Sequence, residues 1–217
     1  LCLGAVWGLL EATLGTLLHL EAFDSIIFAS TAVLLPIAYL ICGRAYSLTG
    51  KARTAIYVGI VAASIKALCF IFVPAVNKVV NPMVAILLES SIMTVAFRVA
   101  KPSKICSIKS FVTFVVASTA IRVAYVGYSM ATAVPFQSAY LVEGNIVWDK
   151  VIEYVITMNA ISFVYIALFM LAGYGIKALA KRPNFAKFTA KVQHFAYTPV
   201  FAAVMICAAV VSTIFLK

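Results

Sequence analysis

The sequence predicts an all-α integral membrane protein, a polytopic bundle of about seven transmembrane helices. Hydrophobic residues make up 65% of the 217 residues and charged residues only 11%, with a mean hydropathy of +1.09. A soluble domain of this length has about a quarter charged residues. The apolar residues gather in long runs, and the basic residues lie between them. Lipid is therefore the expected solvent for this chain.

Each run is close to the ~20 residues that cross ~30 Å of hydrocarbon as a helix. The runs lack the alternation of barrel strands, so helices are expected. The second and fourth are short, so they could be tilted little or only partly inserted. The predicted spans are 2–20, 26–42, 54–74, 82–99, 110–134, 151–176 and 196–216.

Prolines mark helix boundaries in this pattern. Asn81 followed by Pro82 is typical of a helix start, so the fourth helix is expected to begin there. Pro135 ends the fifth run. Pro36 lies inside the second run and predicts a kink.

Basic residues alternate from one side of the predicted bundle to the other. One set of connections holds twelve basic residues and no acid, in the segments 44–53, 98–109 and 177–191. The opposite connections hold Lys78 and Lys150 together with four acids. The positive-inside rule then places the N-terminus inside and the C-terminus outside. Membrane orientation also accounts for the net charge of +10 without a nucleic-acid partner.

The whole chain, residues 1–217, is predicted to be one transmembrane domain in the cell (plasma) membrane, of prokaryotic origin. The longest outer connection, 135–150, contains Tyr140 and Trp148. It could fold over the outer face as a lid, although an ordinary interfacial loop with its aromatics at the headgroup level explains it slightly better.

Four charged residues lie well inside apolar runs: Glu11, Lys66, Glu89 and Arg122. Each costs at least ~2.5 kcal/mol to insert, so all four are expected to face the bundle interior. They could form a polar binding site, or they could form two structural ion pairs that fix helix register. The sequence does not decide which acid meets which base.

Helical spacing extends this set toward the outer side. His19, Glu153 and Asn159 are expected to join the four central charges around a pocket that opens outward. His19 lacks a partner at metal-ligand spacing, so neither a metal nor another cofactor is expected.

Small residues four apart form a ladder of Gly4, Gly8 and Ala12 on the first helix, and a second ladder on the third. Such spacing lets two helices approach closely. Packing inside the bundle is the simpler interpretation, and docking of a partner subunit is the alternative. No HExxH, GxSxG or P-loop motif is present, so neither a protease, a hydrolase nor an ATPase is supported, and the chain is not expected to be an enzyme.

A small helical bundle with the ladder Gly4, Gly8 and Ala12 on its first helix resembles the substrate-binding S component of energy-coupling-factor transporters. The stretches GAVWGLLEATLGTLLH and NPMVAILLES resemble those of S-component-like proteins near this family. The resemblance implies a compact bundle, commonly of six spans, that captures vitamins or metal-related ligands from outside. It also implies a transmembrane coupling protein and an ATPase pair as partners. The seventh span departs from this pattern, or is an addition to a bundle of six, and no ligand is carried over.

Small-molecule capture within a transporter is therefore the leading prediction. Lys66 and Arg122 would neutralise an anionic group, and Glu11 and Glu89 would hold a cationic or hydrogen-bonding part. Two other functions are open. One is a structural or accessory subunit whose charges pair internally, and the other is a membrane-embedded enzyme that acts on a lipid.

Overall fold

The computed structural model describes residues 1–17, 30–68, 77–132, 140–142, 145–179, 198, 201 and 203–204. Its long helices are α1 (Cys2–Leu17), α2 (Ser30–Thr49), α3 (Thr54–Leu68), α4 (Asn77–Ala100) and α5 (Ile108–Ala131), followed by a sixth made of α7 (Trp148–Ile152), the π-helical segment η4 (Glu153–Thr157) and α8 (Met158–Leu179). A small antiparallel hairpin, β1 (Leu141–Val142) with β2 (Asn145–Ile146), precedes α7. The all-α prediction is confirmed for these residues. The predicted seventh span lies almost entirely outside them.

Four of these helices are long and apolar enough to span a bilayer: Ser30–Thr49, Val79–Ala100, Ile108–Ala131 and Trp148–Ile176. Large apolar side chains on their surfaces are exposed, among them Val99, Val116 and Leu171. Polar side chains such as Ser118, Arg122 and Ser162 are instead buried. Apolar surface outside and polar groups inside is the arrangement that lipid requires. By helix length and hydropathy, the chain is a multi-pass membrane protein.

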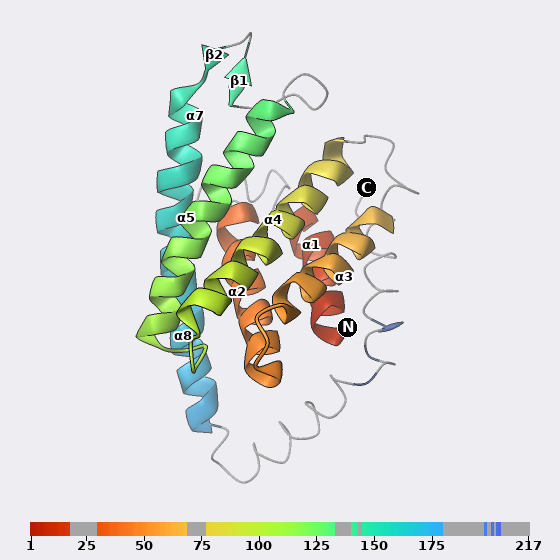
Figure 1. Cartoon of the computed structure of the whole chain (residues 1–217), viewed down its shortest axis with the longest axis vertical. Coiled ribbons are helices and arrows are strands. Elements are labelled where there is room, and N and C mark those ends of the chain that lie inside the picture. The colour runs from red at the N-terminus through yellow and green to blue at the C-terminus, as the bar shows by residue number, and fades with distance from the viewer. Residues whose placement is uncertain are drawn as a thin grey trace.

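Helix α2 lies at the centre of the bundle and packs against α1, α3, α4, α5 and α8. In Figure 1 the pair α5 and α8 forms one side of the molecule, and α3 crosses the other side together with α4. The connections α2–α3 and α4–α5 and the end of α8 lie at the same end. The basic segments 44–53 and 98–109 therefore share that end, as the charge pattern predicts.

Several predicted boundaries are wrong. Helix α4 begins at Asn77, so Pro82 lies inside it and does not start it. The missing Pro82 N–H removes a single hydrogen bond to the preceding turn, and packing against α3 compensates for that loss. Helix α2 continues through Arg44 to Thr49. The second and fourth helices are thus full-length spans, because their basic ends extend beyond the apolar runs. Trp148, expected in a loop, starts α7.

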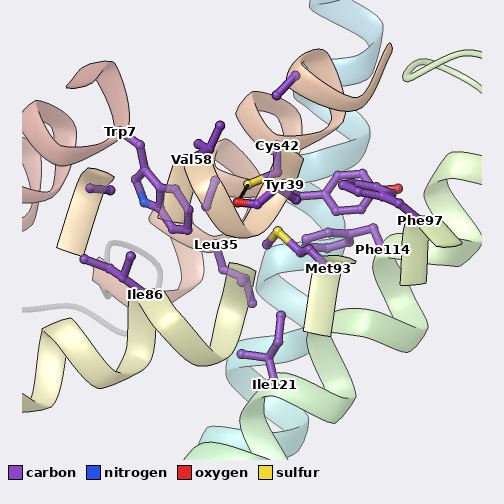
Figure 2. Close-up of a cluster of buried hydrophobic side chains, with 14 of the residues drawn as sticks. Trp7, Leu35, Tyr39, Cys42, Val58, Ile86, Met93, Phe97, Phe114 and Ile121 are labelled. Carbon is purple, nitrogen blue, oxygen red and sulfur yellow. Dashed lines mark hydrogen bonds between the residues drawn. The ribbon is translucent and has the colours of Figure 1, made fainter. Parts of the chain in front are cut away.

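The hydrophobic core joins the helices around Tyr39 of α2. Figure 2 shows the rings of Tyr39, Phe97 and Phe114 gathered at one side of the core and Trp7 at the opposite side. The Tyr39 ring centroid lies 5.2 Å from those of both Phe97 and Phe114. Its hydroxyl donates to the Ser110 carbonyl oxygen at 2.7 Å. This core fixes α2 against α4 and α5, and so positions the polar residues on the same helices.

Candidate functional site

Arg122 lies in α5 with only 1% of its surface exposed. Its Nη2 donates to Ser162 Oγ at 2.7 Å and to the carbonyl oxygens of Met158 and Thr31 at 3.2 and 3.3 Å. Its Nε donates to Asn159 Oδ1 at 3.4 Å. A guanidinium suits this position because it offers five N–H donors in a fixed plane and stays charged. One residue thus ties α5 to α2 and α8.

The partners of Arg122 are themselves held in place. The Ser162 hydroxyl lies 3.0 Å from the Ala32 carbonyl oxygen. The Asn159 amide donates to Thr119 Oγ1 at 2.8 Å, which aims its oxygen toward Arg122. Such second contacts restrict the rotamers of the groups that meet the charge. Most of the guanidinium is therefore fixed by a connected network.

The π-helical segment η4 places an aromatic ring over the guanidinium. Tyr154 lies with its ring centroid 4.9 Å from Arg122 Cζ, within the range of a cation–π contact. Its ring also lies 5.9 Å from that of Tyr125 and 5.5 Å from that of Tyr140. Burial raises the pKa of the Tyr140 hydroxyl, so this group stays neutral at physiological pH. Tyr154 thus covers one face of the guanidinium, and Tyr125 and Tyr140 pack around Tyr154.

Glu11 lies on α1 beside a buried tryptophan. Trp7 is fully buried, and its Nε1 donates to Glu11 Oε1 at 3.2 Å. Lys66, in the last turn of α3, interacts electrostatically with Glu11. Burial disfavours a negative charge on this carboxylate, whereas the indole N–H and the ammonium group favour one.

Glu89 lies near the middle of α4 and interacts electrostatically with both Glu11 and Arg122. It forms no direct ion pair with Arg122, since the one salt bridge among the described residues joins Lys150 to Glu153. Two buried side-chain atoms have no hydrogen-bond partner among the described residues, and they are Glu89 Oε2 and Arg122 Nη1. One is an acceptor and the other is a donor. Unsatisfied buried polar atoms of this kind are uncommon and need an explanation.

Five of the predicted site residues therefore belong to one polar cluster. Glu11, Lys66, Glu89, Arg122 and Asn159 are linked by hydrogen bonds or by electrostatic interaction. This central polar cluster has two acids and two bases from α1, α3, α4 and α5. Two of its atoms, Glu89 Oε2 and Arg122 Nη1, still lack a hydrogen-bond partner among the described residues.

The structure places Glu153 apart from the central polar cluster. Its carboxylate lies 3.4 Å from Lys150 Nζ, and its side chain is 39% exposed. His19 lies outside the described residues. The hydrogen bonds of Arg122 to the described residues do not include Glu153.

The ladder residues Gly4 and Gly8 face α3. A Cβ atom on Gly4 would lie 2.6 Å from Val61 Cβ, and one on Gly8 would lie 2.8 Å from Ile65 Cδ1. Ala12 is also buried. Packing inside the chain thus accounts for both glycines, and docking of a partner subunit stays a prediction.

Sequence reasoning missed Ser162, Tyr154 and the carbonyl oxygen of Thr31. Ser162 lies three residues after Asn159 on one face of α8, a spacing that could have been noticed. Tyr154 depends on η4, and no sequence signal for a π-helical turn was visible. Every residue has a backbone carbonyl oxygen, so the sequence gives no signal for the ones that accept from Arg122.

No group of three or more metal-ligating side chains lies together within the described part of the chain. Comparisons with protein-family models, with characterised proteins and with solved structures find no match to this chain. Its function is therefore argued from its own geometry.

Proposed function

We propose that this protein is the substrate-binding membrane component of a transporter. A small molecule would enter from the outer side of the cell membrane and bind at the central polar cluster. One observation carries the proposal: Arg122 Nη1 and Glu89 Oε2 are both buried and both lack a partner among the described residues. A bound polar group supplies the missing partners, and burial in a low-dielectric interior strengthens its contacts.

The arrangement fits a ligand with an anionic group. Arg122 is anchored by Nη2 and Nε, which leaves Nη1 free to donate. Lys66 adds a second positive charge, which interacts electrostatically with Glu11. Such anchoring lowers the ordering cost that binding would otherwise carry.

Energy for uptake would come from partner subunits, because the sequence has no nucleotide-binding loop. By its resemblance to S components, a coupling membrane protein and an ATPase pair are the expected partners. A prokaryotic cell membrane is the expected location.

The test is purification from native membranes in mild detergent, followed by mass spectrometry of all proteins and small molecules recovered. We expect a bound small molecule, and less of it from Lys66→Ala. Glu153→Gln serves as the matched control, because it alters a charge outside the central polar cluster. A stoichiometric membrane complex with no ligand would support the accessory-subunit function and reject this one.

A lipid-acting enzyme remains the third candidate. Turnover of a co-purified lipid by the isolated protein would favour it over substrate capture.

A further inference from the structure

The two acids of the central polar cluster differ in what surrounds them. Glu11 accepts a hydrogen bond from the Trp7 indole and has Lys66 nearby. Glu89 has no donor on Oε2 among the described residues. It lies instead beside the carboxyl group of Glu11, which repels a second negative charge. An ionised carboxylate is thus better supported at Glu11 than at Glu89.

Arg122 does not remove this difference. It interacts with Glu89 electrostatically, yet four of its contacts go to acceptors on α2 and α8. Because no direct ion pair forms between them, the guanidinium compensates little of the cost of burying a charge on Glu89. A neutral carboxylic acid avoids that cost.

The titratable and charged groups that act on Glu89 come from each neighbouring element. The thiol and the phenols among them are neutral at physiological pH, so they provide no countercharge. Lys66 acts through its effect on Glu11. The groups are Glu11 of α1, Cys42 of α2, Lys66 of α3, Arg122 and Tyr125 of α5, and Tyr154 of η4.

We propose that Glu89 is a proton-binding site, protonated at neutral pH, and that the anionic group of the ligand binds between Glu89 and Arg122 while Glu89 keeps its proton. The O–H of Glu89 and Nη1 of Arg122 then both donate to the same anion. The second part of this inference rests on the proposed function.

Linkage fixes the sign of the resulting pH dependence. A ligand that needs protonated Glu89 also strengthens proton binding there, because coupling is reciprocal. Affinity for the anion is constant at low pH. It falls about tenfold per pH unit once Glu89 loses its proton in the free protein. Glutamine cannot ionise, so Glu89→Gln should bind the anion with little dependence on pH.

Infrared spectroscopy of the ligand-free protein in lipid nanodiscs tests the proton-binding site directly. A protonated carboxylic acid has a carbonyl stretching band apart from the amide bands. We expect this band at neutral pH in the natural protein and in Glu11→Gln, and we expect Glu89→Gln to lack it. A band absent from the natural protein, or one that disappears only in Glu11→Gln, would overturn the assignment.

A second measurement separates this inference from the proposed function. The protein purified with its bound small molecule is washed at rising pH, and retained ligand is quantified by mass spectrometry. Loss of ligand at high pH from the natural protein but not from Glu89→Gln supports the coupling. Equal loss from both proteins rejects the coupling while leaving substrate capture intact. An infrared band with no ligand recovered would reject substrate capture and leave the proton site standing.

Discussion

Arg122 and Glu89 are both charged residue types held inside the bundle, yet the protein surrounds them differently. Arg122 donates to four protein acceptors and lies under the Tyr154 ring. Glu89 has a buried oxygen without a described partner. The α5–α8 side of the site is therefore built by the protein itself, whereas the α4 side holds a buried oxygen to which no described residue donates.

This comparison separates a residue that holds helices together from a residue that is expected to bind a ligand. A purely structural ion pair would join Glu89 to Arg122, and among the described residues the one ion pair joins Lys150 to Glu153 instead. Substitution at Arg122 should therefore affect folding most, whereas replacement of Glu89 by glutamine should change the pH dependence of binding more than the stability.

Replacing Arg122 with leucine should produce the largest loss of stability. It removes four hydrogen bonds from a charged donor. We expect a net loss of about 3–5 kcal/mol, as when one partner of a buried charged network is removed. The free energy of unfolding of the detergent-solubilised protein measures this loss. Arg98→Leu, at an exposed position of α4, is the matched control. Equal stability of the two variants would show that the Arg122 network contributes nothing.

Replacing Gly4 with valine tests the close approach of α1 and α3. The new side chain would overlap Val61 and the Val58 carbonyl oxygen. Overpacking of this kind costs about 1–3 kcal/mol. Gly127→Val is the control, because a Cβ at Gly127 meets nothing within 4 Å. A Gly4→Val protein that is fully stable alone but loses its partner subunits would instead favour the docking interpretation of the ladder.

The acids Glu11 and Glu89 give a finer comparison. Glu11→Gln removes the charge from an acceptor of the Trp7 N–H, and hydrogen bonds to charged groups contribute about 1.5–3 kcal/mol. We expect Glu11→Gln to lower the free energy of unfolding by that amount or less. Glu89→Gln should be nearly neutral, because glutamine resembles the protonated acid. Trp7 fluorescence in a Trp148→Phe background can report unfolding, since the chain has only these two tryptophans. The reverse order of the two losses would contradict the assigned charge states.

Glu153→Gln should have the smallest effect. Its ion pair with Lys150 is exposed, and such pairs contribute about 0–1 kcal/mol. We also expect unchanged ligand recovery, measured by mass spectrometry beside the natural protein. A strong loss of ligand in Glu153→Gln would return this residue to the binding site.

Much of the fold could be predicted from the sequence because lipid imposes a simple rule on it. Long apolar runs and alternating basic clusters identified the described helices and the end at which the basic segments lie. Several helix boundaries were predicted wrongly, because the pattern of apolar runs and basic clusters does not determine where a helix ends. Arg44 continues α2 because basic side chains can extend from a helix end to the headgroup region. Pro82 is tolerated within α4 because neighbouring packing offsets one lost hydrogen bond.

The candidate site was predictable in part for a similar reason. Charges inside apolar runs must face inward, which identified Glu11, Lys66, Glu89 and Arg122 together. The pattern could not show which groups these charged side chains contact. Arg122 donates mainly to carbonyl oxygens and to Ser162 rather than to an acid. Tyr154 reaches Arg122 from the π-helical segment η4, a local geometry that spacing rules for α-helices do not foresee.

A high-resolution density map of the protein purified from native membranes would test the central claim most directly. The claim is that a bound small molecule supplies the partners that Glu89 Oε2 and Arg122 Nη1 lack among the described residues. We predict non-protein density larger than a single water, within hydrogen-bond distance of both Arg122 Nη1 and Glu89 Oε2. A direct ion pair between the two side chains, or one bridging water in every molecule, would contradict it and leave the central polar cluster as a structural element.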